Sequence, residues 1–157
     1  MSYIIGMNLT DVRTNAEGPA FALGSVGRTS DGKQYKYVQY NSGAGAVAAV
    51  AGNVVYYYAP SGASAGATTV VTSDLSDSAA VGAGVLQAVI ASTGYGWIQT
   101  RGSATLNTAL TAGADGNALT PVGSTDGTLD VSALVTDHHC AVAVDASAKI
   151  VMCLFPD

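Results

Sequence analysis

Charged side chains are scarce in this chain. Of its 157 residues, 11% are charged, whereas the share in an average soluble domain is roughly 25%. Interfaces between proteins are depleted of charged residues, so part of this surface is expected to be covered by a partner or by further copies of the chain. Serine, threonine, asparagine and glycine supply other uncharged surface. The composition therefore predicts a protein that works in contact with other proteins.

Basic residues are few and dispersed. The net charge is −5, and the six basic residues do not form a cluster. They are Arg13, Arg28, Lys33, Lys36, Arg101 and Lys149. Nucleic-acid binders carry clustered lysine and arginine side chains that release counterions from phosphates, and anionic membranes attract polybasic segments. The sequence therefore predicts that neither nucleic acid nor a membrane is a partner.

Long hydrophobic runs are also missing. No apolar run approaches the roughly 20 residues of a membrane-spanning helix. The first six residues contain neither the basic region nor the long apolar core of a secretory signal. We therefore expect the protein to be made and kept in a cytosol-like compartment. Its length of 157 residues fits a single domain.

Residue patterns for catalysis are equally poor. Gly62 to Gly66 matches the G-x-S-x-G turn of serine hydrolases, but the β-branched residues that follow favour a strand where that motif requires a helix. Glycoside hydrolysis requires paired carboxylates, yet the single glutamate is Glu17 and no aspartate lies in an aromatic-rich stretch. We therefore expect no enzymatic activity and no catalytic residues.

Candidate metal ligands are limited to one short segment. Asp137 to Cys140 spells the signature of membrane protein acyltransferases, but the cysteine-rich zinc domain and the membrane helices of that family are missing. On a strand, His138 and His139 point to opposite faces and cannot easily share an ion. His138 with Cys140 and Cys153 would still lack a fourth ligand, and the aspartate–glycine pairs are typical of turns rather than calcium loops. The sequence predicts no metal and no cofactor.

The chain does contain many short apolar segments rich in valine, isoleucine, threonine and tyrosine, separated by turn residues. This pattern predicts β-strands. The segments are 21–26, 33–40, 54–58, 68–73, 85–90, 95–101, 140–144 and 149–154. The alanine-rich run Ala44 to Ala51 is punctuated by glycine and predicts one short helix or turn at most. We predict an all-β fold, a compact antiparallel β-barrel or β-tulip-like body.

The first 20 residues differ from the rest. They lack a clean period, and Asn15 to Pro19 is typical of a loop. We therefore divide the chain into an extended N-terminal arm, residues 1–20, and a β-rich body, residues 21–157. Tyr3, Ile4 and Ile5 are apolar residues of this arm and are candidate anchors on a partner. The alternative is a strand that completes the chain's own sheet.

The segment Val54 to Tyr58 is apolar on both faces. A strand of this kind is covered on both sides, by the core on one side and by something else on the other. Together with the low charge density, it predicts a homo-oligomer, most simply a trimer. Tyr56, Tyr57 and Tyr58 are therefore candidate contacts, as is Trp97.

The last strands are predicted to form a hairpin around the turn Asp145 to Ala148. Closing that turn with two or with four residues gives the same register. Cys140 then lies opposite Cys153, with Cα atoms about 4.5 to 5.5 Å apart, within the reach of a disulfide. In a reducing compartment we expect both thiols to stay free and to behave as small buried apolar groups.

Four segments carry a resemblance to a known group of proteins. They are 21–27, 30–38, 94–102 and 110–113. In these stretches the chain resembles small head proteins of tailed bacteriophages, of the capsid decoration or cement class, over roughly residues 21 to 154. The resemblance implies a compact β-barrel or β-tulip body with an arm, trimers at threefold lattice positions and no catalytic residues.

The function implied by the resemblance is binding to the outer surface of an assembled head, with the major capsid protein as partner. The protein would be made in the host cytoplasm and located on the virion. A tail or adhesion subunit of a phage is the first alternative. A carbohydrate-binding module that stacks sugars on Trp97 or on tyrosines is the second. An exposed Trp97 would favour the module, and a buried Trp97 would favour the virion proteins.

Overall fold

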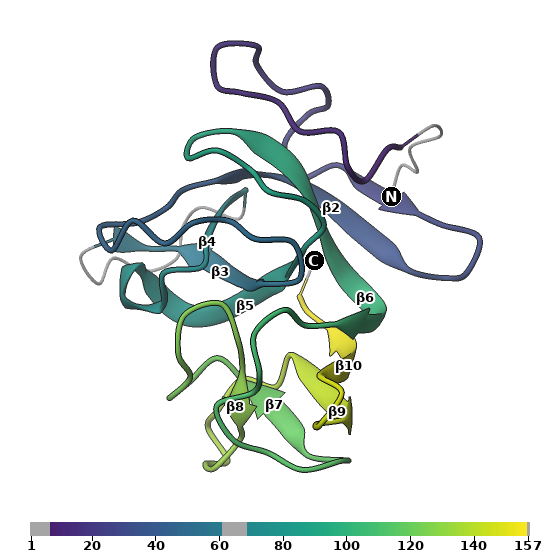
Figure 1. The fold of residues 1–157 in the computed structure, drawn as a ribbon, viewed down its shortest axis with the longest axis vertical. Helices are drawn as coiled ribbons and strands as arrows, with labels where there is room; N and C mark the ends of the chain where they lie inside the picture. The colour runs from purple at the N-terminus through teal and green to yellow at the C-terminus, as the bar shows by residue number, and fades with distance from the viewer. Residues whose placement is uncertain (1–6, 61–68, 157) are drawn as a thin grey trace.

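The computed structural model describes residues 7–60 and 69–156, and Figure 1 shows their path. Within these residues the fold consists of strands, one 3-10 turn (η2, Leu75–Asp77) and loops, with no α-helix. The strands are β1 (Val26–Arg28), β2 (Gln34–Tyr40), β3 (Val54–Tyr58), β4 (Val70–Thr72), β5 (Ser78–Leu86), β6 (Tyr95–Thr105), β7 (Ala118–Thr120), β8 (Asp130–Val131), β9 (Ala141–Asp145) and β10 (Ile150–Leu154). The predicted all-β fold is confirmed. No helix in the described ranges is long and apolar enough to cross a membrane.

Five of the strands close into a barrel, in the order β2-β4-β3-β5-β6 and back to β2. Closure comes from the antiparallel pairing of β2 with β6, in which Tyr37 lies opposite Trp97. The pair β2 and β4 is parallel and the other pairs of the barrel are antiparallel. The sheet is therefore mixed, whereas the sequence predicted an antiparallel barrel.

The sheet continues beyond the barrel through β6, its longest strand. The first part of β6 pairs with β2 and β5, and its last part pairs with β10. The order β6-β10-β9-β7-β8 then forms a second sheet, seen below the barrel in Figure 1. The two parts meet at Arg101, which pairs with both Gln34 and Leu154. The next residue, Gly102, has a φ of 96°, a conformation that L side chains rarely adopt.

Three apolar clusters fill this arrangement. One lies inside the barrel, one lies between the barrel and the second sheet, and one covers the outside of β2 and β6. Alternate residues of β3 belong to the first two, because successive side chains of a strand point to opposite faces. Val55 and Tyr57 face the barrel interior, whereas Val54 and Tyr56 face the second cluster.

The coverage of β3 corrects one sequence-based inference. Val54 to Tyr58 is covered on both sides as predicted, but both covers come from the same chain. The apolar character of this segment is therefore explained without an oligomer. The predicted trimer loses this support and stays a prediction.

Residues 7–20 lie along the body. Arg13 forms an isolated antiparallel bridge with Tyr95, with backbone N–H groups donating in both directions at 3.0 and 2.8 Å. Met7 and Leu9 pack against the third cluster, which contains Trp97. The described part of the predicted arm therefore contributes to the chain's own packing. Tyr3, Ile4 and Ile5 lie outside the described residues.

Two predicted strands are misplaced. Residues 21–25 form turns, and β1 begins only at Val26. The strand predicted over 85–90 ends at Leu86 and begins as early as Ser78, because its first half consists of small residues with weak strand propensity. Pairing with β3 stabilises this half of β5 as a strand, which its local sequence favours only weakly.

The register of the C-terminal hairpin also differs from the prediction, by one residue. Cys153 pairs with Ala141 rather than with Cys140. A bulge between Ile150 and Val151 shifts the ladder, and a bulge adds a residue to one strand only. Cys140 precedes β9, and its N–H donates to the carbonyl of Leu119 at 3.0 Å.

Candidate binding surface

The outer face of the second sheet carries exposed apolar side chains. Along β10 the residues alternate: Val151 and Cys153 are buried, whereas Met152 and Leu154 are 41% and 51% exposed. Val144 on the neighbouring strand β9 is 50% exposed. Large apolar side chains that gather on one exposed sheet face are typical of a contact surface. We call Val144, Met152 and Leu154 the apolar face.

Polar residues of β6 border the apolar face. Ser103 lies opposite Met152 and Arg101 lies opposite Leu154 in the antiparallel pairing. Both β6 residues are exposed. An apolar stripe beside a polar and charged rim is the usual composition of a protein–protein interface.

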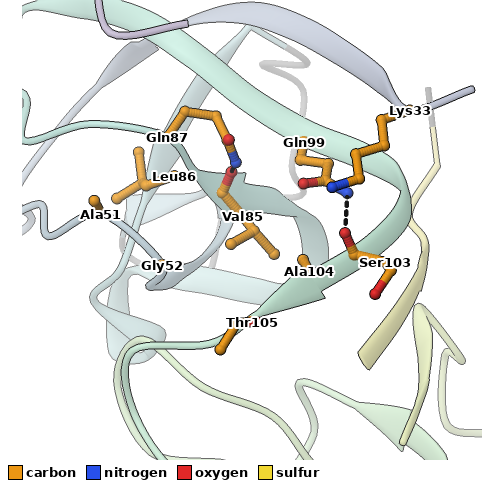
Figure 2. Close-up of a pocket in the computed structure, with 10 residues that line it drawn as sticks. All are labelled: Lys33, Ala51, Gly52, Val85, Leu86, Gln87, Gln99, Ser103, Ala104 and Thr105. Carbon is orange, nitrogen blue, oxygen red and sulfur yellow. Dashed lines mark hydrogen bonds between the residues drawn. The ribbon is translucent and has the colours of Figure 1, made fainter. Parts of the chain in front are cut away.

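A polar cavity of about 460 Å³ lies where the barrel meets the second sheet (Figure 2). Its lining includes Lys33, Gln87, Gln99 and Ser103. The Gln99 amide donates to the backbone carbonyls of Arg101 and Ser103 at 3.1 and 2.9 Å, and the Gln87 amide donates to that of Val85 at 3.0 Å. These hydrogen bonds hold the side chains of Gln87 and Gln99 against the backbone that lines the cavity. The residues that line it include no histidine, aspartate, glutamate or cysteine.

A smaller cavity of about 250 Å³ lies at the end of β10. Its polar lining consists of Arg101, His138 and His139, and its apolar lining includes Leu154 and Pro156. Leu154 thus belongs both to this cavity and to the apolar face. We call this cavity the histidine pocket.

Among the residues predicted as contacts, three are buried. Tyr56, Tyr57 and Trp97 are 0%, 5% and 1% exposed, because other segments of the chain fold over them. The structure therefore lends no support to a contact with a capsid or another copy through these side chains, and that contact stays a prediction. Tyr58 is half-buried.

The residues of the apolar face were not predicted as contacts, because Ile150 to Phe155 is apolar throughout and shows no polar alternation in the sequence. From Val151 to Pro156, buried and exposed residues alternate strictly. This alternation is the period of a strand with one covered face. Met152 and Leu154, which are apolar, occupy the exposed positions, so the uncovered face favours contact with a partner.

Both cysteines are free and buried in the cluster between the barrel and the second sheet. Burial raises the pKa of the Cys153 thiol to about 12 and also raises that of Cys140. Thiols rather than thiolates are therefore present at neutral pH, and thiols are poor nucleophiles and metal ligands. No group of three potential metal ligands occurs within the described ranges. The G-x-S-x-G segment, 62–66, lies outside them.

One buried cation was not foreseen. Lys36 points into the barrel and is 5% exposed. Its ammonium donates to the Tyr57 hydroxyl at 3.1 Å and lies 5.1 Å from the centre of the same ring. The Tyr57 hydroxyl donates in turn to the carbonyl of Pro156 at 3.3 Å. A hydrogen bond and a cation–π contact offset part of the cost of burying this charge, so Lys36 has a structural role here.

Comparisons with protein-family models, with curated proteins and with solved structures found no match. Function is therefore inferred from the surface chemistry of this chain and from the sequence resemblance described above.

Proposed function

We propose that the protein is a virion structural protein of the capsid decoration class, which binds the outer surface of an assembled phage head and stabilises it without catalysis. The observation that carries the proposal is the apolar face. Met152 and Leu154 on β10 and Val144 on the adjacent strand β9 are about half exposed. A sheet face of this composition gains free energy when a partner protein covers it.

The shape and chemistry of the body fit this role. Backbone pairing of β10 with both β6 and β9 holds the apolar face in a fixed geometry, so little conformational entropy is lost on docking. A decoration protein that contacts several capsid subunits at once gains affinity through effective concentration, even where each contact is small. The major capsid protein is the proposed partner, and the homotrimer implied by the resemblance would supply several contacts.

The burial of Trp97 bears on the alternatives. At 1% exposure, Trp97 offers no stacking platform for a sugar, which argues against a carbohydrate-binding module built on this residue. A tail or adhesion subunit could use the same apolar face and stays as the alternative. It differs from the leading proposal in the particle to which the protein binds.

The proposal is tested by co-sedimentation with empty heads, and separately with tails, of the phage that carries the gene. The wild-type protein is expected to pellet with heads and not with tails. The double variant M152D/L154D, which places two charges on the apolar face, is expected to lose at least about tenfold in affinity, because an unpaired carboxylate is costly to bury. Circular dichroism confirms that the variant is folded.

V89D is the matched control, since Val89 is 66% exposed but lies outside the apolar face. It should bind like the wild type. Wild-type binding to tails alone would replace the proposal by the tail alternative. A folded M152D/L154D protein that binds heads as well as the wild type would remove the apolar face from the contact.

A further inference from the structure

The polar cavity at the junction of the barrel and the second sheet contains a fixed hydrogen-bond acceptor. Gln99 is 3% exposed, and its Nε2 atom donates to the carbonyls of Arg101 and Ser103. Because a carbonyl only accepts, these bonds determine which end of the amide is nitrogen. None of the described residues donates to the Gln99 Oε1 atom.

This oxygen is open to the cavity. Within the described ranges, the one buried side-chain nitrogen or oxygen atom without a hydrogen-bond partner is Nε1 of Trp97. The Gln99 oxygen also lacks a partner, so it is not among the atoms closed off from solvent. It points away from Ser103, to which the nitrogen of the same amide is bonded (Figure 2).

Gln87 presents a second amide in the same way. It directly follows β5, and its backbone N–H donates to the Trp97 carbonyl of β6 at 3.3 Å. Its Nε2 atom donates to the Val85 carbonyl at 3.0 Å, and none of the described residues donates to its Oε1 atom. Val85 pairs with Gln99 across the two strands. Neighbouring strands therefore hold two amides by their nitrogens and leave both oxygens for a ligand.

Lys33 adds a cation to the lining. A Cβ atom on Gly102 would lie 2.8 Å from Lys33 Cγ and 3.4 Å from Gln99 Nε2, so the missing side chain lets the lysine stem lie against the amide. The Lys33 ammonium is 3.8 Å from an Asp31 carboxylate oxygen, which is longer than a direct hydrogen bond. Its side chain is 34% exposed, so its N–H groups can donate to a ligand.

The rest of the lining is apolar or small. Val85, Leu86 and Ala104 are buried side chains of the lining, and Ser103 and Thr105 lie at its exposed edge. The volume of about 460 Å³ falls in the range of about 300 to 1,000 Å³ for small-molecule sites, which combine an apolar wall with a few placed polar groups. No aromatic ring lines the cavity, so it is distinct from a stacking platform.

We propose that the polar cavity binds an uncharged ligand rich in hydroxyl groups, of the class of a hexose unit in a saccharide. A hydroxyl group both donates and accepts, so it can donate to the oxygen of Gln87 or Gln99 and accept from Lys33. A cation would be repelled by Lys33. An anion would face the two amide oxygens, with the Asp31 carboxylate close to the only cation of the lining.

The probes are the methyl glycosides of glucose, galactose and mannose, in which galactose and mannose each differ from glucose in the direction of one hydroxyl group. Methoxycyclohexane, a six-membered ring without free hydroxyl groups, is the control for apolar binding. The methyl glycosides of glucuronate and of glucosamine in its ammonium form are the charged controls. Binding is followed by the NMR signals of the side-chain amide groups of Gln87 and Gln99.

At least one of the three neutral glycosides is expected to shift both amide signals saturably. It should bind about tenfold more tightly than methoxycyclohexane, which cannot donate to the amide oxygens. It should also bind about tenfold more tightly than either charged glycoside, because a charge without a matching partner is costly to desolvate.

Two variants locate the site. Q87L removes one acceptor, and K33M removes the ammonium but keeps the stem that lies over Gly102. Each should weaken binding by about threefold to tenfold, the effect of losing one hydrogen bond. Q39L is the matched control, since Gln39 is also half-buried and its amide also donates to a carbonyl, that of Thr93, at 2.9 Å. It lies outside the cavity and should bind like the wild type, and circular dichroism confirms that each variant is folded.

The absence of a saturable shift with all three neutral glycosides would overturn the proposal, as would equal binding of methoxycyclohexane. A charged glycoside that binds more tightly than the neutral ones would overturn the assignment to an uncharged ligand. Affinities unchanged in both Q87L and K33M would show that the ligand binds elsewhere. No residue of the apolar face lines the cavity, so the proposed binding to heads can fail or succeed independently of these outcomes.

Discussion

Strands β3 and β10 are equally short and almost equally apolar, yet they have opposite surroundings. In β3, Val54, Val55, Tyr56 and Tyr57 are all buried, with the barrel interior on one side and the second cluster on the other. In β10, Val151 and Cys153 are buried, whereas Met152 and Leu154 are exposed. Both strands are central in their part of the sheet.

The difference between the two strands locates one apolar surface that the described residues leave uncovered. Apolar residues on both faces of β3 are buried when the chain folds. They therefore stabilise the monomer and are not available to a partner. Apolar residues on the outer face of β10 bury little area on folding and keep their capacity to stabilise a complex. Substitutions on β10 should therefore affect binding, and substitutions in the covered regions should affect stability.

The largest effect is expected at Trp97, which the N-terminal segment covers. Its ring lies 5.1 Å from that of Tyr37 and 5.4 Å from that of Phe21, measured between centroids. W97A should lower the free energy of unfolding by about 3 to 5 kcal/mol, the range for truncating a buried aromatic residue. Unfolding in urea followed by far-UV circular dichroism measures this loss. A loss below about 1 kcal/mol, typical of surface substitutions, would show that the N-terminal segment does not cover Trp97.

The next effect concerns the face of β3 that points to the second sheet. The Tyr56 hydroxyl accepts from the Thr128 N–H at 3.1 Å and donates to the carbonyls of Thr125 and Thr128. Y56F leaves these backbone groups without this partner in a buried site, which should cost about 1 to 3 kcal/mol. Y58F, at the half-buried end of the same strand, is the control and should stay within about 0.5 kcal/mol. Equal losses in the two variants would contradict the described contacts.

A smaller and pH-dependent effect is expected at Asp74, which is 2% exposed. Its carboxylate accepts from the Ser76 hydroxyl at 2.6 Å, from the Ser76 N–H at 3.0 Å and from the Gly45 N–H at 2.8 Å. The Ser76 hydroxyl first, and then these N–H groups, hold the pKa of Asp74 below its ordinary value. As a capping residue, Asp74 should stabilise the fold by about 0.5 to 2 kcal/mol.

The pH dependence follows from the direction of that shift. The unfolded chain titrates near pH 3.9 at this residue, and the folded pKa is lower, so the contribution is complete above about pH 4. It is lost as the pH falls through the folded pKa. The difference in unfolding free energy between the wild type and D74N should therefore be constant near neutral pH and shrink below about pH 4. A difference that grows on acidification would contradict the assignment.

The smallest effect on stability is expected on the apolar face. M152T and L154T place a β-branched strand former at an exposed position and should each change the unfolding free energy by no more than about 0.5 kcal/mol. Chemical denaturation of each variant measures this change. A loss above about 2 kcal/mol in either variant would show that these side chains are covered within the chain, and the contrast between β3 and β10 would disappear.

Much of the strand pattern could be predicted from the sequence. The bounds predicted for β3 agree with the structure, and β2 begins one residue later than predicted. Short segments rich in β-branched and aromatic residues can be predicted as strands from their own residues, because these side chains favour strands. The end of β6 was missed for the converse reason: Gly102, Ser103 and Ala104 become strand only through pairing with β10.

The surface was harder to predict than the strands. Aromatic residues such as Tyr56 and Trp97 suggested contacts, since aromatic side chains favour both cores and interfaces. Their burial depends on segments distant in the sequence. The histidine pocket joins Arg101, His138 and Leu154 from β6, from the loop before β9 and from β10, and no sequence motif brings these together.

The amino-acid sequence by itself determined an all-β chain with apolar strands in its centre and at its end, because side-chain size, branching and period are local properties. Only the tertiary structure decided what covers each face. The closure of β2 on β6 placed Trp97 under the N-terminal segment, and the bulge in the last hairpin moved Cys140 out of register with Cys153. These outcomes depend on which strands pair over long distances and in which register, and a shift of one residue exchanges the two faces of a strand.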